Sequence, residues 1–292
     1  MHSDLKCDPP PLPTPCPHFF YSSLAVGKHV ALMSEMGSVV DSRRFMELSE
    51  IEQNIACSDN PNDHLRDAMG FLTTGKVDPF DALRLFALYA LRYEKTRGDK
   101  VAELRRFVSE RFEMQDSLNL VDTLLNTAGT SARACDLFGT AAGGAAGALL
   151  SRIASTVKRS VAGVQNVYTQ HQPLLTNLLD SLARGKLQRG TFPFVGAEPP
   201  PGKVSTVIVF FVGGATYEEA AKVADINAGR LVIGAANSSG PTLAPTGTTV
   251  TPPFRVVLGG STVHSARTFF AELTRCGGGG GGAGHVAVNM DL

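Results

Sequence analysis

The 292-residue chain has no excess of charge and few cysteines. Its 27 basic and 27 acidic side chains cancel, so no overall electrostatic attraction to nucleic acid or to anionic lipid is expected. The cysteines are odd in number and widely scattered, and none forms a Cys-x-x-Cys pair. This pattern indicates a reducing, cytosolic environment and not a disulfide framework. They are Cys7, Cys16, Cys57, Cys135 and Cys276.

Long apolar runs are also missing. None approaches the roughly 18 residues needed to span a bilayer. The segment Met1–Phe20 lacks the basic and apolar regions of a signal peptide. It is rich in proline, so we expect residues 1–28 to be disordered. A zinc site at Cys7, Cys16 and His18 is disfavoured because a closed structural site needs four ligands.

Helical periodicity dominates the first two thirds of the chain. Apolar residues recur every three or four positions over 29–57. The strongest helix signal follows at Asp78, which can cap a helix that begins with Pro79. That helix is apolar around most of its girth, so we expect it to be central in a helical layer. Further helices are expected at about 100–113, 116–128, 145–160 and 173–184.

A small-residue tract, Gly139–Leu150, interrupts these helices. It could be taken for a glycine-rich phosphate loop, but it lacks the Gly-Lys-Ser/Thr ending and follows no strand. We interpret it as a linker.

The composition changes after the Pro/Gly-rich segment Thr191–Lys203. The run 207–212 is continuously β-branched or aromatic, which is typical of a strand covered on both faces. We expect a helix at 216–227, a second strand from 256–258 and a second helix at 262–273. This order predicts strand–helix units with parallel strands.

The two strand–helix units share a Gly-Gly pair followed by threonine. In the first, Gly213-Gly214 allows a tight turn, and Thr216 with Glu219 forms a capping box. In the second, the corresponding residues are Gly259, Gly260 and Thr262. We assign these residues structural roles as turns and caps.

A nucleotide could be imagined at the Gly-Gly turns because helix N-termini attract phosphate. Neither turn has Gly-x-Gly-x-x-Gly spacing, and Glu218 and Glu219 would repel an anion. His264, expected in the first turn of its helix, and His171 lack any neighbouring nucleophile motif. No catalytic, cofactor-binding or metal-binding residue is therefore assigned.

Several blocks together resemble the C-terminal half of the Sec/Munc (SM) family, and most closely its endosomal branch. The most specific are Gly163–Pro173 (GVQNVYTQHQP) and the strand-Gly-Gly-helix units at 207–220 and 255–273. His29–Cys57, Lys76–Lys95 and Cys135–Phe138 match in order and spacing. The resemblance implies part of an arch: a mainly helical domain followed by an incomplete α/β portion.

On this basis we expect disorder at 1–28, a helical domain at 29–190 and a linker at 191–206. An α/β half-domain at 207–273 would carry a low-complexity insert at about 229–254. Residues 274–292 would form a glycine-rich disordered tail.

The resemblance implies a non-enzymatic protein that binds a syntaxin-like SNARE and the SNARE complex. It would act in vesicle docking and fusion on the Golgi–endosome–vacuole route, cytoplasmic and held peripherally at membranes by its partners, with no nucleic acid and no cofactor. The helix expected to begin at His29 resembles one limb of the family's SNARE-facing hairpin. The resemblance therefore implies that His29, Glu35 and Arg43 are candidate partner contacts. Two alternatives remain: a small α/β enzyme that uses the Gly-Gly turns, and a truncated scaffold without SNARE binding.

Overall fold

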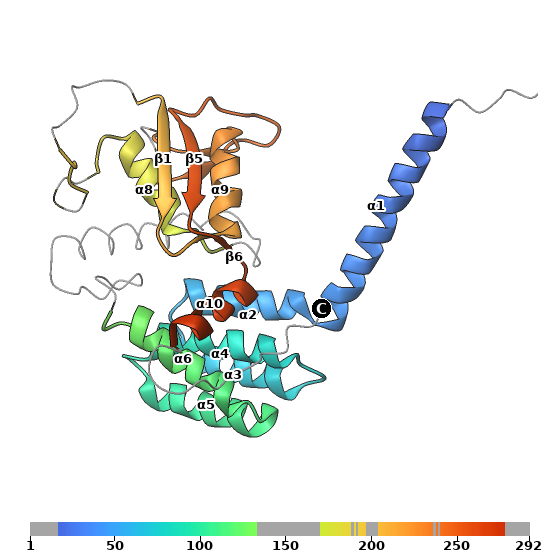
Figure 1. The fold of residues 1–292 in the computed structure, drawn as a ribbon, viewed down its shortest axis with the longest axis vertical. Helices are drawn as coiled ribbons and strands as arrows, with labels where there is room; N and C mark the ends of the chain where they lie inside the picture. Colours follow the sequence, from blue (N-terminus) through green and yellow to red (C-terminus); the bar gives the residue numbers. More distant parts are fainter. Residues whose placement is uncertain are drawn as a thin grey trace, which may run out of the picture. The chain divides into compact units, whose positions relative to one another are not determined.

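The computed structural model describes residues 17–132, 170–187, 190, 192–196, 204–235, 238 and 240–277 (Figure 1). The chain divides into two compact units, Met1–Met46 and Glu47–Leu292, and each is described by itself. The linker expected at 139–150, the helix expected at 145–160, the block at Cys135–Phe138 and the tail after 277 lie outside the described residues. So do the zinc ligands considered at Cys7 and Cys16.

The first unit consists mainly of the long helix α1, Pro17–Ser42. The expectation of disorder over residues 1–28 is therefore wrong for 17–28, which form the first turns of α1. The helical character expected over 29–57 is confirmed, but the structure divides this region between two helices. Arg44 adopts a left-handed backbone with φ 52°, which ends the helical path before α2 begins at Phe45.

The second unit contains a layer of packed helices. They are α2 (Phe45–Cys57, which begins at the end of the first unit), α3 (Pro61–Thr73), α4 (Pro79–Tyr93), α5 (Gly98–Phe112) and α6 (Gln115–Ala128). Helix α4 contacts α3, α5 and α6, so its predicted central position is confirmed.

The start of α4 follows from local chemistry. The Asp78 side chain accepts a hydrogen bond from the Phe80 backbone N–H at 2.8 Å, and Pro79 occupies the first turn. Inside the layer, Phe86, Tyr89 and Tyr93 are almost fully buried. Burial of each such aromatic side chain contributes about 1.5–3 kcal/mol, so α4 provides much of the stability of this layer.

Helix α3 was not expected from the sequence, because Pro61 and the polar residues around it indicate a break. Proline is compatible with the first helical turn, and the helix buries a stripe that includes Leu65, Phe71 and Leu72. On the same helix, His64 is buried, with Nδ1 2.7 Å from the Tyr93 hydroxyl and Nε2 2.9 Å from Ser58 Oγ.

The buried His64 should make stability depend on pH. Burial, and then the nearby Arg92 guanidinium, lowers the pKa of His64 below its ordinary 6.5, against the opposing influence of Asp59, Asp63 and Asp67. The folded state therefore binds this proton less readily than the unfolded state. The resulting stability is fully present above about pH 6.5 and is lost as the pH falls through the lowered pKa.

We therefore expect the melting temperature to fall more steeply between pH 7.5 and pH 5 for the parent chain than for His64→Gln, whose amide does not titrate. Thermal unfolding followed by circular dichroism measures both slopes. Equal slopes would show that His64 is not the cause of the pH dependence of stability.

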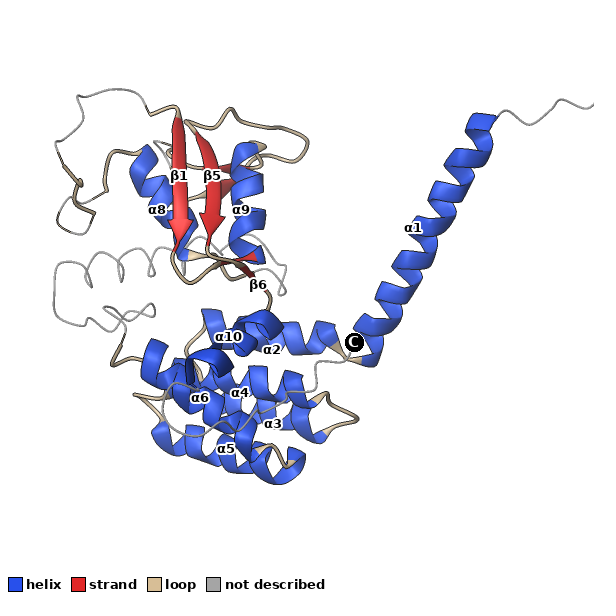
Figure 2. Ribbon diagram, in the orientation of Figure 1, coloured by secondary structure: helices blue, strands red, loops and turns tan. Residues whose placement is uncertain are grey.

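The α/β part of the second unit centres on two parallel strands, β1 (Thr206–Phe211) and β5 (Arg255–Gly260), which lie side by side (Figure 2). Their register pairs Thr206 with Arg255 and Phe211 with Gly260. The crossover between them contains α9 (Tyr217–Asn227). The parallel strand–helix arrangement predicted from the sequence is confirmed.

One face of this sheet packs on helices α8 (Leu174–Ala183) and α9. Side chains from both helices, from the segment after α9 and from the sheet form one apolar cluster. Its buried members are Leu175, Leu179, Val223, Ile226, Leu231, Ile233, Phe254 and Val256. Helix α8 was assigned to the helical domain from the sequence, but the structure packs it in the core of the α/β part instead.

The insert expected at about 229–254 contributes to this core. It contains the short antiparallel pair β3 (Leu231–Val232) and β4 (Thr242–Leu243), and Leu231 and Ile233 are buried. Its exposed part, 245–251, keeps the polar, Pro- and Thr-rich character of a surface loop. The remaining domain boundaries stay predictions.

Beyond the carboxyl ends of β1 and β5, two short strands form a second parallel pair, β2 (Ala215–Thr216) and β6 (Val263–His264). The final helix, α10 (Ala266–Gly277), begins later than the expected 262. It packs on α6, and the ring of Phe270 meets that of Phe80 edge-on at 5.7 Å. Thus α10, expected in the α/β half-domain, contacts the helical layer.

Among the helices of the described ranges, none combines the length and the apolar character required to cross a bilayer.

Candidate functional site

Helix α1 presents many apolar side chains to solvent. Their exposed fractions lie between 49% and 72%. They are Val26, Val30, Leu32, Met33, Met36 and Val39. Exposed apolar side chains at three- and four-residue spacing on a helix mark an interaction surface, because isolated soluble domains rarely leave so many of them uncovered.

The three polar residues assigned to this surface from the sequence differ in position. His29 and Glu35 are exposed on α1. Arg43 lies just beyond the helix end, half-buried, with its guanidinium 4.6 Å from the centre of the Phe45 ring. The apolar periodicity of this region predicts a helix, but it does not indicate that the apolar side chains themselves form the exposed surface.

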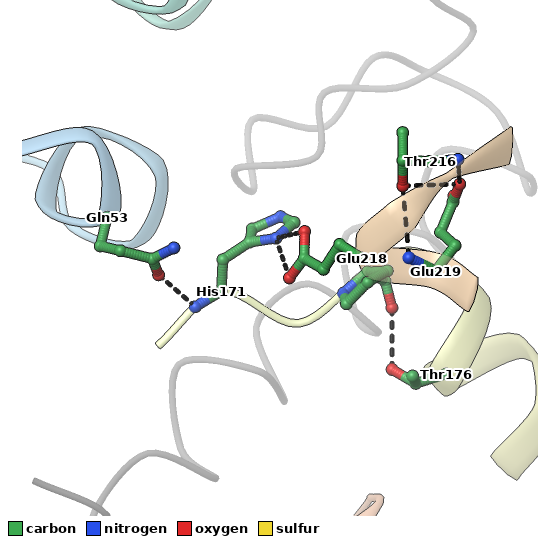
Figure 3. A network of polar contacts seen from close by, with 7 residues as sticks. Gln53, His171, Thr176, Thr216, Glu218 and Glu219 are labelled. Carbon is green, nitrogen blue, oxygen red and sulfur yellow. Dashed lines mark hydrogen bonds and ion pairs between the residues drawn. The ribbon is translucent and has the colours of Figure 1, made fainter. Parts of the chain in front are cut away.

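A second candidate site lies where residues 170–173, the described end of YTQHQP, meet the start of α9 in VGGATYEEA (Figure 3). His171 Nδ1 lies 3.0 Å from a carboxylate oxygen of Glu218, at the start of α9. The backbone N–H of His171 donates to the Gln53 side chain on α2 at 2.7 Å. Three chain segments far apart in sequence are thus joined through one residue.

This polar contact links distant chain segments but is only weakly stabilising. His171 and Glu218 are 40% and 44% exposed, and an exposed pair of this kind contributes at most about 1 kcal/mol. Burial, and then the Glu218 charge, raise the pKa of the Cys57 thiol to about 11, against the opposing influence of Arg92. A thiol with so high a pKa carries almost no thiolate at neutral pH.

The first Gly-Gly turn has the backbone that its sequence predicts. Gly213 and Gly214 have φ of 101° and 106°, a region that favours glycine. The His264 ring fills the space above the turn: its Nε2 lies 2.8 Å from the Gly213 carbonyl oxygen and so donates to it. His264 is therefore a structural residue of β6, and its expected place in a helix is wrong.

The start of α9 contains the predicted capping box. Thr216 Oγ1 accepts from the Glu219 backbone N–H, and the Glu219 carboxylate accepts from the Thr216 backbone N–H at 2.7 Å. The carboxylates of Glu218 and Glu219 both lie in the first turn of α9. Because they would repel an anion, this helix N-terminus is not suited to phosphate.

The second Gly-Gly pair differs from the first. Gly259 and Gly260 are the last residues of β5 and not a turn. A Cβ on Gly260 would lie 3.1–3.3 Å from atoms of Ala215, Thr262 and Phe211, so glycine is needed there for close approach. Thr262 does not cap α10; Ser265 and Thr268 bond reciprocally there instead, at 2.9 and 3.3 Å.

Within the described part of the chain, no group of three or more His, Cys, Asp or Glu side chains is arranged to hold a metal ion.

Known proteins similar to this chain share its architecture. A match to the Sec1 family spans residues 17–272. Vacuolar protein sorting-associated protein 45 of Rattus norvegicus is 33% identical over 261 residues, which cover 89% of this chain and 41% of that protein. The Arabidopsis thaliana homologue is 36% identical over 248 residues, covering 85% and 38%. The chain thus spans about two fifths of the length of these relatives.

Solved structures agree with these sequence matches. The SM protein Vps45 in complex with the Qa SNARE Tlg2 (1–310) superposes with a TM-score of 0.66 at 34% identity, over 91% of this chain and 41% of that one. A further structure of the SM protein Vps45 gives a TM-score of 0.60 at 30% identity, over 89% of this chain and 40% of that one. The resemblance inferred from the sequence is confirmed: this chain belongs to the Sec1 family.

Proposed function

We propose that this chain is a non-enzymatic SM protein that binds a syntaxin-like Qa SNARE and its SNARE complex. It promotes vesicle docking and fusion on the Golgi–endosome–vacuole route, at the cytoplasmic side of Golgi and endosomal membranes, where its partners hold it. The related Vps45 structure in complex with the Qa SNARE Tlg2 supports the identity of the partner.

The observation that carries this proposal is the set of exposed apolar side chains on α1. SNARE helices pair through apolar seams at three- and four-residue spacing, and an amphipathic helix binds an apolar surface of the same periodicity. Val30 and Met33 lie three residues apart on α1 and are 60% and 72% exposed. They are the proposed centre of the contact, and His29, Glu35 and Arg43 are proposed polar contacts around it.

The test is binding of the purified chain to the cytosolic region of Tlg2, measured by calorimetry. We expect Val30→Glu combined with Met33→Glu to weaken binding about tenfold to a hundredfold, because removal of one or two well-packed anchors costs about 1.4–2.8 kcal/mol. Glutamate retains good helix propensity, so α1 should persist, as circular dichroism would verify.

The control is Leu243→Glu on β4, which changes a side chain of similar exposure, 61%, in the other unit. Binding should be unaffected by it. Binding should also persist when the N-terminal peptide of Tlg2 is removed, because this contact uses helices. Strict dependence on that peptide, or equal binding by the double variant, would contradict the proposal.

A further inference from the structure

Two methionine side chains of α1 are open to solvent. Met33 and Met36 lie about one helical turn apart and are 72% and 58% exposed. Methionine is more often found among the fully buried residues of a protein. In this chain Met69 on α3 and Met114 at the start of α6 are partly buried. The thioethers of α1 are therefore more accessible to solutes than those of α3 and α6.

The helix surface next to these thioethers is unobstructed. Gly37 follows Met36 directly, and a Cβ placed on it would meet no atom within 4 Å. The same holds for Gly27, earlier on the same helix. A small solute such as a peroxide can therefore reach either sulfur without any local unfolding of α1.

The reaction open to such a thioether is oxidation by a hydroperoxide. With hydrogen peroxide, the sulfur attacks one peroxide oxygen, so that an S–O bond forms as the O–O bond breaks. The second oxygen leaves as water with both protons. The sulfur loses two electrons and the peroxide gains them. The product, methionine sulfoxide, is polar where the thioether was apolar.

The position of the two methionines makes this change of polarity important for binding. Met33 lies three residues from Val30, and the two form the proposed centre of the SNARE contact. Met36 lies about one turn further along the same helix. A sulfoxide oxygen that is buried against an apolar helix loses its hydration without gaining a hydrogen-bond partner. Sulfoxides at these positions therefore oppose SNARE binding.

A thiol competes poorly for the same oxidant in the described part of the chain. Peroxide reacts with the thiolate form of cysteine. Burial, and then the Glu218 charge, raise the pKa of the free Cys57 thiol to about 11, so almost no thiolate is present at neutral pH. A thioether does not ionise, and its reaction has no such requirement.

We propose that Met33 and Met36 form a reversible oxidation site that controls SNARE binding by α1. The co-substrate is a hydroperoxide, and the sulfoxide form releases the SNARE. Methionine sulfoxide reductases, one enzyme for each sulfoxide epimer, restore the thioethers and with them the binding. This inference rests on the proposed function, because it assigns a regulation to the same contact.

The test combines peptide mass spectrometry with calorimetry. The purified full chain is treated with hydrogen peroxide, and mass spectrometry locates each added oxygen. We expect Met33 and Met36 to be oxidised faster than Met69 and Met114. Complete oxidation of the first two should weaken binding to the cytosolic region of Tlg2 by about tenfold or more. Treatment with both reductases should restore the initial affinity.

A double variant separates oxidation on α1 from oxidation elsewhere. Met33→Leu combined with Met36→Leu nearly conserves volume and helix propensity. It should bind Tlg2 as the parent does and keep its affinity after peroxide treatment. The matched control is Met46→Leu on α2, which removes a methionine of 49% exposure outside the proposed contact. This control should remain as sensitive to peroxide as the parent chain.

Binding that survives complete oxidation of Met33 and Met36 would overturn the inference. So would an equal loss of binding by the leucine double variant, or a loss that dithiothreitol reverses, which would assign the effect to a thiol. A fall in melting temperature that accompanies the lost binding would trace it to unfolding, with the same consequence. Absence of binding before any oxidation would instead contradict the proposed function itself, and the inference with it.

Discussion

Replacing Asp180 by alanine is expected to destabilise the fold by about 3–5 kcal/mol, because removal of one partner leaves the other charge buried and unpaired. Asp180 on α8 is 5% exposed. It accepts two hydrogen bonds from Arg184, at 2.7 and 3.0 Å, and one from the Gly234 backbone N–H at 2.7 Å. The variant would leave the Arg184 guanidinium and this N–H without that acceptor. Urea unfolding measures the loss as a lower midpoint at constant slope.

The matched control is the pair between Asp225 and Arg230. It has similar geometry, 2.8 Å between Arg230 Nη2 and a carboxylate oxygen, but its side chains are 33% and 58% exposed. Asp225→Ala should therefore cost less than about 1 kcal/mol. If the two variants were equally stable, burial would not be what makes the Asp180 pair important.

Helix starts could be predicted where the signal is local. Asp78 and Pro79 specify the first turn of α4, and Thr216 with Glu219 specify that of α9, because each cap depends on residues within three positions. Such interactions form in the same way whatever packs around them. Both caps are present in the structure.

Other elements depend on tertiary packing, and the sequence predicts them wrongly or not at all. Helix α3 begins at a proline within a polar segment, and its stability comes from its buried stripe. Thr262 resembles Thr216 in sequence, yet β6 follows it and the helix starts only at Ala266. The difference arises because the residues after Gly260 pair with β2, a contact that the local sequence does not encode.

The exposure of the apolar side chains of α1 could not be predicted from the sequence either. Like α4, α1 contains apolar residues three and four positions apart, but α4 is buried among helices, whereas Val30 and Met33 face solvent. Periodicity predicts a helix with apolar faces and not whether those faces are covered within the chain. The hydrogen bond from the Asn227 side chain to the Val256 carbonyl and the contact between His171 and Glu218 likewise cannot be predicted from local sequence, because each joins distant segments.

The Gly213-Gly214 turn yields the second large effect. Gly214→Ala is expected to destabilise the fold by about 2–6 kcal/mol, as the sum of backbone strain and overpacking. The backbone has φ 106°, which an L side chain rarely adopts. A Cβ would also lie 2.6 Å from His264 Cδ2 and 2.7 Å from Thr262 Cγ2, so β6 would have to move away from β2.

Gly213→Ala separates the two contributions. Its φ is similar, 101°, but a Cβ there would meet no atom within 4 Å. Gly213→Ala should therefore be destabilised by backbone strain alone, by about 1–3 kcal/mol. Urea unfolding of both variants gives the difference directly, and that difference measures how tightly His264 closes the turn. If Gly213→Ala proved as destabilising as Gly214→Ala, the His264 ring would not be a fixed part of the turn, and the glycine pair would be required for backbone conformation alone.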